Sequence, residues 1–274
     1  MPEPAERTQT TVLALGPRRG ISLKIYRHFL VVAVGQFGDT FEHQDFLLDT
    51  GAAPSIINAR LVKRLGLETR TSTLSAAGKV VPTQTAIVPE VELGPVRADF
   101  LPVQVHDLSR LERELGIPLA GLIGLDVLSK ASFRLDYENK KIEFGDLLHK
   151  GIPVPFDART NLAVVTVTFG SRPARMLVDT GSGRVVLFGG NFEAIGWPEL
   201  RNFSPLGTSL ADQEMRVGEF FASDILLPGN TSGRTRLISY KVAKILLLTV
   251  CWVCALGFRA VSYDQTKRTL YLQK

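Results

Sequence analysis

Two short segments of the chain share a pattern that could carry out acid–base chemistry. An Asp-Thr-Gly triplet follows the apolar residues 46–48, and a second one follows the apolar residues 176–178. A carboxylate at the end of a buried strand is costly unless it has a purpose. Two carboxylates brought together share a proton, because both cannot ionise easily. The ionised one can then take a proton from a water molecule while the other donates to the carbonyl under attack.

The residues beside each aspartate suit supporting roles. Each threonine hydroxyl can bond to the backbone of the opposite segment, and each glycine lets its N–H group approach a carboxylate closely. The next residue is small in both copies, which leaves room for the water. The candidate site is therefore Asp49, Thr50, Gly51 and Ala52 together with Asp179, Thr180, Gly181 and Ser182.

The two triplets belong to an internal repeat with a spacing of about 130 residues. A β-rich stretch precedes each one, and each copy ends in an alternating pattern typical of a hairpin, at 133–144 and 261–272. The prolines of Lys150–Pro155 make a natural joint. We predict an all-β protein with a flexible tail at 1–20, an N-terminal lobe at 21–149 and a C-terminal lobe at 150–274.

The segment FLLDTGAAPSII (46–57) resembles the active-site strand and turn of retropepsin-like aspartic peptidases. Leu122-Ile123-Gly124 in AGLIGLDVL resembles the hydrophobic-hydrophobic-Gly element that supports the aspartate loop in that family. The resemblance implies two similar β-barrel lobes with an active-site cleft between them, and an endopeptidase that needs no metal or cofactor. One chain here carries both halves, which implies a monomer with approximate two-fold symmetry. The short lobes and the LIGLDVL segment resemble bacterial retropepsin-like proteins more than secreted pepsins.

The same resemblance implies a flap hairpin over the cleft in each lobe. In the first lobe we place it at Ser75–Lys79, which includes Ala76, Ala77 and Gly78. In the second lobe the corresponding segment is 209–213, with Ala211 and Asp212. The implied substrate is an extended polypeptide.

The second lobe departs from the pattern where the supporting element is expected. Aligning the two hairpins places Thr249 opposite Gly121 and Trp252 opposite Gly124, so the glycines are missing. A shifted reading frame through residues 248–253 can encode Asp-Gly-Leu-Leu-Gly, which suggests that part of 229–254 is a frameshifted ancestral element. Ordinary divergence is the rival explanation. The alternative function is therefore an impaired or inactive homologue that binds peptides, or a relic.

The remaining features of the sequence exclude several other classes. The net charge of +5 is carried by scattered Lys and Arg residues, without the dense basic run of a nucleic-acid-binding protein. Cys251 and Cys254 form a lone CxxC pair inside an apolar run, which favours two buried thiols over a zinc or redox site. That run, Ile245–Phe258, is too short to span a membrane. No signal sequence is visible, which indicates a cytoplasmic protein; a start upstream of Met1 would allow export.

Overall fold

The computed structural model describes residues 9–12, 20–26, 29–36, 42–76, 79–145, 150–157, 162–169, 172–182, 185–188, 203–205, 216–227, 231–240, 247–250 and 257–274. Strands make up most of these residues, which confirms the all-β prediction. None of the helices in this part of the chain is long and apolar enough to cross a membrane.

The N-terminal half contains β1 (Gln9–Val12), β2 (Gly20–Tyr26), β3 (Phe29–Gln36), β4 (Glu42–Leu48), β5 (Ile56–Asn58), α1 (Ala59–Leu65), β6 (Thr69–Ala76), β7 (Lys79–Leu93), β8 (Val96–His106), α2 (Ser109–Leu115), β9 (Gly121–Ile123), α3 (Leu125–Leu128), β10 (Phe133–Asp136) and β11 (Lys141–Phe144). The C-terminal half contains β12 (Ile152–Asp157), β13 (Val164–Phe169), β14 (Arg172–Val178), β15 (Val185–Phe188), β16 (Phe203–Pro205), β17 (Arg216–Leu227), β18 (Thr231–Tyr240), β19 (Leu247–Val250), β20 (Ala260–Asp264) and β21 (Thr269–Gln273).

Strand pairing follows the same order in the two halves. In the N-terminal half the order β3–β4–β9–β5–β8–β7 returns to β3 through one pair, Gln36 with Glu92. In the C-terminal half the order β13–β14–β19–β15–β18–β17 returns to β13 through two pairs, Thr168 with Leu226 and Phe169 with Ile225. We call these the first and second strand rings. Because so few pairs link β7 to β3, the first ring is not the fully closed barrel that the resemblance implied.

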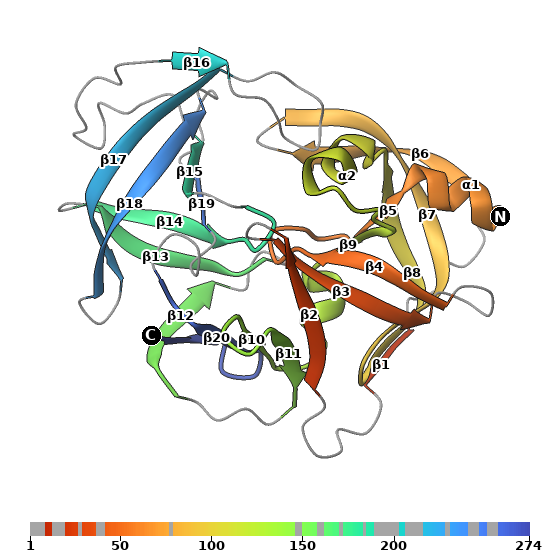
Figure 1. Cartoon of the computed structure of the whole chain (residues 1–274), viewed down its shortest axis with the longest axis horizontal. Helices are drawn as coiled ribbons and strands as arrows, with labels where there is room; N and C mark the ends of the chain where they lie inside the picture. Colours follow the sequence, from red (N-terminus) through yellow and green to blue (C-terminus); the bar gives the residue numbers. More distant parts are fainter. Residues whose placement is uncertain are drawn as a thin grey trace, which may run out of the picture.

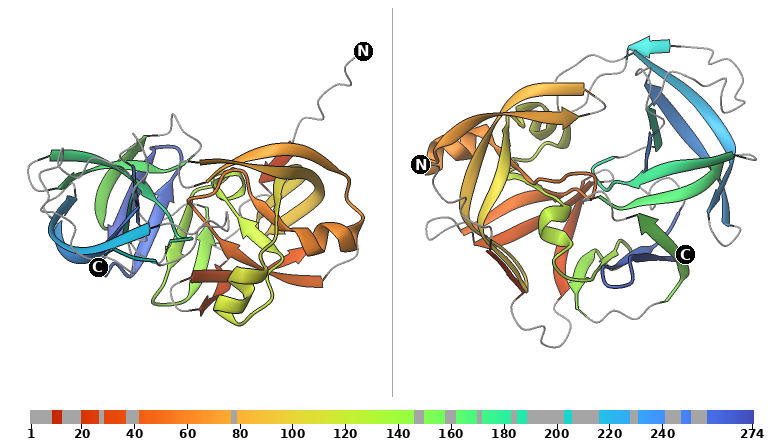
Figure 2. Two further views of the ribbon diagram at one scale, coloured as in Figure 1. Left: turned by 90° about the horizontal axis from the view of Figure 1, so that it is seen from above. Right: turned by 180° about the vertical axis from the view of Figure 1, so that it is seen from behind.

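The two rings lie side by side, and the ends of β4 and β14 meet between them (Figure 1). The same meeting point of the orange and green strands is visible from behind (Figure 2). Below it, the terminal hairpins β10–β11 and β20–β21 pair with each other through β10 and β20. Both hairpins were predicted from the sequence and are confirmed. The boundary between lobes at residues 149 and 150 stays a prediction.

The turns of the two hairpins are built alike. The Asp136 Oδ1 atom accepts a bond of 2.8 Å from the Asn139 N–H, and the Asp264 Oδ1 atom accepts one of 2.9 Å from the Lys267 N–H. Lys140 and Arg268 follow with the same φ of 51°. Asp136 and Asp264 are therefore equivalent positions of the repeat.

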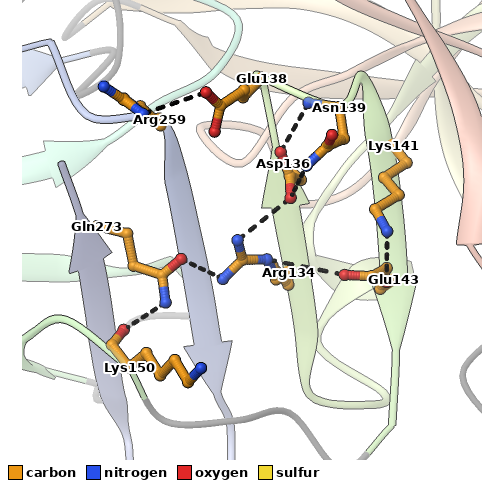
Figure 3. Close-up of polar contacts among 9 residues, drawn as sticks. All are labelled: Arg134, Asp136, Glu138, Asn139, Lys141, Glu143, Lys150, Arg259 and Gln273. Atoms are coloured by element: carbon orange, nitrogen blue, oxygen red, sulfur yellow. Dashed lines mark hydrogen bonds and ion pairs between the residues drawn. The ribbon is translucent and has the colours of Figure 1, made fainter.

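A polar network fastens the first hairpin to the last strand of the chain (Figure 3). The Arg134 guanidinium bonds to the Gln273 side chain and, over 3.2 Å, to Asp136. The Gln273 side chain in turn donates to the Lys150 carbonyl over 2.9 Å. This network ties the joint at Lys150 to both hairpins, so the halves are held by side chains as well as by β10 and β20.

Apolar side chains of both halves form one large buried cluster. It extends from Leu23 and Phe46 through Phe133 to Val178 and Leu272. Burial of this size accounts for most of the favourable free energy of a β fold. A smaller cluster, which includes Ile56, Leu108 and Leu122, packs where α2 covers the first ring.

One part of the predicted N-terminal tail is ordered. Gln9–Val12 forms β1, which pairs antiparallel with β8 from Val96 to Asp99. The flexible tail at 1–20 stays a prediction for the rest of that segment. The free edge of β8 offers unpaired backbone groups, and the Thr-Thr-Val stretch has the β propensity to take them up.

Candidate active site

The strands β4 and β14 deliver one aspartate each to the meeting point of the rings. The side chains of Phe46, Leu48 and Met176 are buried in the core, and each strand ends directly before its aspartate. Asp49 is itself 7% exposed. Burial of an isolated carboxyl group is unfavourable, so the burial of the apolar strand is what holds the Asp49 carboxyl group in this position.

The two threonines join the turns through reciprocal hydrogen bonds. The Thr50 hydroxyl donates to the Val178 carbonyl over 2.8 Å, and the Thr180 hydroxyl donates to the Leu48 carbonyl over 2.7 Å. Each hydroxyl also accepts from the backbone N–H of the other threonine, at 3.1 Å and 3.0 Å. This is the arrangement expected from the sequence. Four buried bonds leave the turns little freedom to move apart.

The two carboxyl groups lie against one another across these turns. The Gly51 N–H donates to its own aspartate, Asp49, over 2.9 Å, and the Gly181 N–H donates to Asp179 over 2.8 Å. A Cβ on Gly181 would lie 2.6 Å from the Asp49 carboxyl carbon, and one on Gly51 would overlap Asp179. Each carboxyl group therefore lies against the glycine of the opposite turn. Only glycine allows this approach.

Burial raises the pKa of Asp49 above its ordinary value of 3.8. The hydrogen bond with Asp179 and the bonds from backbone N–H groups of the turns act in the opposite direction but do not offset the loss of water. The arrangement therefore favours a state in which the pair retains a proton. That state supplies an acid and a base side by side.

The raised pKa gives a test that does not depend on activity. A carboxyl whose pKa is raised on folding favours the folded state below the unfolded value of 3.8, and this advantage is lost as the pH rises through the folded pKa. Asp49→Asn is therefore expected to be more stable than the wild type at pH 7, with a gap that closes toward pH 3. Melting temperatures across this range measure it.

Asp107 is the matched control for that test. Its pKa is lowered, mainly because it accepts a bond of 2.9 Å from the Ser109 N–H. Asp107→Asn should therefore lose stability at pH 7, in the opposite sense to Asp49→Asn. Equal effects of the two substitutions would contradict the burial argument.

The segment 121–124 supports the Asp49 turn from behind. The Ile123 carbonyl accepts from the Asp49 N–H over 2.9 Å, and β9 runs parallel to β4 with Leu122 beside Leu47. A Cβ on Gly124 would overlap the Ala52 carbonyl. Leu122, Ile123 and Gly124 thus lie directly behind the Asp49 turn.

Ser55 and Asp126 complete this support, and sequence reasoning missed both. The Ser55 hydroxyl donates to the Asp126 carboxylate over 2.6 Å and accepts from the Gly124 N–H over 2.9 Å. The Ser55 N–H donates to the other carboxylate oxygen over 2.9 Å. The residues are far apart in the sequence, and only their presence in the segments PSII and LIGLDVL could have drawn attention to them.

The second ring differs from the first at β19. The register in which β19 pairs with β14 also differs from the one that the sequence predicted. Leu248 pairs with Met176 on β14, in the place that Gly121 takes beside Phe46. The pairing of Leu187 with Leu248 on β15 gives the same correspondence, since Ile57 pairs with Gly121. The predicted match of Thr249 with Gly121 is therefore wrong by one residue. The glycine is replaced by leucine, and Val185 stands where the first ring has Ser55.

Ala52 and Ser182 close the two turns. The Ala52 N–H donates to the Asp49 carbonyl over 3.1 Å, and the Ser182 N–H donates to the Asp179 carbonyl over 3.4 Å. In addition, the Tyr263 hydroxyl of β20 lies 3.5 Å from the Thr50 hydroxyl. No feature of the sequence pointed to this tyrosine.

The predicted flap of the first ring lies at the tip of the β6–β7 hairpin, which is paired up to Ala76 with Lys79. Several other predictions fall outside the described residues: Ala77, Gly78, Ala211, Asp212, Cys251, Trp252 and Cys254. The strands β16 and β17 pair on either side of the second predicted flap, as β6 and β7 do. Within the described ranges, no group of three or more His, Cys, Asp or Glu side chains is placed to hold a metal.

Thr180→Val is expected to destabilise the protein by roughly 3 kcal/mol, because the isosteric valine leaves the Leu48 carbonyl and the Thr50 N–H buried without a partner. Urea unfolding measures the change. Thr166 is exposed on β13, so Thr166→Val should change stability by less than about 0.5 kcal/mol. Equal effects of the two substitutions would show that the threonine bonds do not hold the halves together.

Comparisons with known proteins bear on the first ring. Among curated proteins, none matches the chain. Residues 33–127 match the family model described as aspartyl protease. The matched region contains Asp49, its turn and the supporting segment up to Gly124. This match supports the aspartyl protease family, and with it a hydrolase that acts on peptide bonds.

Proposed function

We propose that the protein is an aspartic endopeptidase in which Asp49 and Asp179 together activate a water molecule. The observation that carries the proposal is the pair of carboxyl groups, one from each half, each lying against the glycine of the opposite turn at the meeting point of the rings. A single carboxyl could not supply both proton acceptor and proton donor at one place. The aspartyl protease match of the first ring agrees with this reading.

The reaction follows from the shared proton. The ionised carboxylate takes a proton from a water bound between the two groups, and the water oxygen attacks the peptide carbonyl carbon. The protonated carboxyl donates its proton to the carbonyl oxygen, which gives a tetrahedral diol. A proton then passes to the amide nitrogen as the C–N bond breaks. The chain's own groups are sufficient for every step.

The N–H groups of Gly51 and Gly181 and the threonine bonds have a second role in this scheme. They hold both carboxyl groups in place before the substrate arrives, so that little reorganisation is needed during the reaction. The site would then be complete in one chain, with the two halves as pseudo-symmetric lobes and a polypeptide as substrate.

A specific observation favours a second candidate function. Leu248 in place of a supporting glycine leaves Asp179 with a different backing from Asp49. A protein with a loosened second turn could bind peptides without cleaving them efficiently.

A cleavage assay separates the two candidates. Denatured proteins are incubated with the purified chain at acidic and neutral pH, with and without pepstatin. Cleavage that pepstatin blocks, and that a variant lacking the Asp49 carboxylate loses, supports the endopeptidase. Peptide binding in the absence of any cleavage would favour the second candidate.

A further inference from the structure

We infer that Tyr263 is a positioning residue for the proposed reaction, because its phenol braces the threonine hydroxyl that ties the two aspartate turns together. The inference rests on the proposed function and assigns it a residue outside both Asp-Thr-Gly segments. Tyr263 lies on β20, in the C-terminal hairpin, and its side chain is 1% exposed.

The phenol completes the hydrogen bonding of the Thr50 hydroxyl. That hydroxyl donates to the Val178 carbonyl over 2.8 Å and accepts from the Thr180 N–H over 3.1 Å. The Tyr263 hydroxyl lies 3.5 Å away and donates to the remaining lone pair. A hydroxyl has one proton and two lone pairs to share, so all three are now used. The Thr50 hydroxyl is thereby held in one orientation toward the second turn.

The tyrosine ring is itself held rigidly. It stacks on the Phe133 ring with centroids 4.4 Å apart and an interplanar angle of 12°. The two residues are also backbone partners in the pairing of β10 with β20. A phenol fixed by backbone and by ring stacking can transmit its position to its hydrogen-bond partner at little cost in entropy.

The brace acts on only one of the two threonines. Because Asp136 and Asp264 are equivalent, the counterpart of Tyr263 is Leu135, the residue before Asp136. Leucine has no group to donate, so the first hairpin offers no matching brace to the Thr180 hydroxyl. The bond from Tyr263 therefore acts on the same Thr50 hydroxyl that binds the second aspartate turn. That turn is the one whose supporting strand lacks the glycine found in the first ring.

Loosening the contact between the Thr50 hydroxyl and the second turn would weaken the interaction between the Asp49 and Asp179 carboxyl groups. Two carboxylates held close together have widely separated apparent pKa values, because the first charge opposes the second. If the turns shift apart, the two values approach each other. The pH range in which the pair holds one proton then becomes narrower.

Tyr263→Phe is the test, because it keeps the stacked ring and removes only the hydroxyl. We expect kcat on a polypeptide to fall roughly tenfold, as for loss of one hydrogen bond, with KM changed less than twofold. The bell-shaped profile of kcat against pH should become narrower than that of the wild type. All rates are expressed per folded molecule, with the folded fraction measured by circular dichroism.

Two further variants separate positioning from packing. Tyr271 lies on the partly exposed face of β21, so Tyr271→Phe removes a phenol without touching the brace and should leave the kinetics unchanged. Tyr263→Leu also removes the stacked ring and should narrow the profile as much as Tyr263→Phe while lowering the melting temperature further. A wild-type profile for Tyr263→Phe, or an effect confined to Tyr263→Leu, overturns the inference.

Cleavage measurements on Asp49→Asn and Tyr263→Phe together show whether the role of Tyr263 alone is wrong or the proposed function as a whole. If cleavage persists in Asp49→Asn, the two carboxylates do not carry out the reaction and both proposals fall. If cleavage requires Asp49 but Tyr263→Phe retains the wild-type kcat and pH profile, only the role of Tyr263 falls.

Discussion

Asp49→Asn is expected to lower kcat/KM on a polypeptide by at least about 10³-fold. An amide cannot take a proton from water, and it cannot share one with Asp179. The Asp49 side chain is buried, and its carboxyl group lies against Gly181 of the opposite turn. Initial rates on a fluorogenic peptide measure the effect.

The two aspartates should behave as one unit. Asp179→Asn is expected to lose as much activity as Asp49→Asn, and the double variant should lose little more, since either change already removes the shared proton. Asp45 provides a control on the same strand: it forms a partly exposed ion pair with Lys24 at 3.1 Å. Asp45→Asn should keep activity within about twofold. Activity of Asp49→Asn close to that of Asp45→Asn would exclude the shared-proton mechanism.

The parts of this site that the sequence predicted are those that depend on local pattern. The apolar run before each aspartate must form a buried strand, and the following Thr-Gly must form a turn, whatever the rest of the fold. The terminal hairpins were predicted for the same reason, because alternation and a polar turn are visible within a dozen residues. The meeting of Asp49 with Asp179 then follows from the repeat itself.

The register of β19 shows where that reasoning ends. The predicted correspondence was counted back from the second hairpin on the assumption of equal connections. The connection from Val250 to Asp264 is one residue longer than that from Ile123 to Asp136, so the count slipped by one. A slip of one residue turns every side chain of a strand to the other face, and only backbone pairing reveals it.

The polar contacts around the site were equally hidden. Ser55 and Asp126 meet because β5 and β9 are neighbours, and Tyr263 reaches Thr50 because β20 lies below the meeting point of the rings. Each contact joins residues from different elements by a side chain whose direction depends on the backbone. Repeat symmetry could not supply the tyrosine, since its counterpart is Leu135.

The shifted register also changes the view of the second half. With Leu248 in the place of Gly121, the residue in the place of Gly124 is Cys251 and not Trp252. The steric argument for a frameshift assumed a tryptophan at this place, and that assignment is wrong by one residue. The choice between a frameshift and ordinary divergence stays a hypothesis.

Gly124→Ala tests how strictly the first half depends on its own glycine, and it is expected to destabilise the protein by about 3 kcal/mol or more. A Cβ at this position overlaps the Ala52 carbonyl, and backbone atoms cannot turn away as a flexible side chain could. Relief would have to shift either the Asp49 turn or the Ser55 bond to the Gly124 N–H. We therefore expect activity per folded molecule to fall as well. Chemical unfolding and initial rates measure the two effects.

Gly66 separates this steric effect from the ordinary cost of replacing glycine. It ends α1 with a φ of 62°, and nothing lies within 4 Å of a Cβ built there. Gly66→Ala should cost only about 1 kcal/mol, from left-handed backbone strain, and leave activity per folded molecule unchanged. If Gly124→Ala cost no more than Gly66→Ala, close backing by segment 121–124 would not be what holds the Asp49 turn. The argument that the second half is impaired because it lacks these supporting glycines would then fall as well.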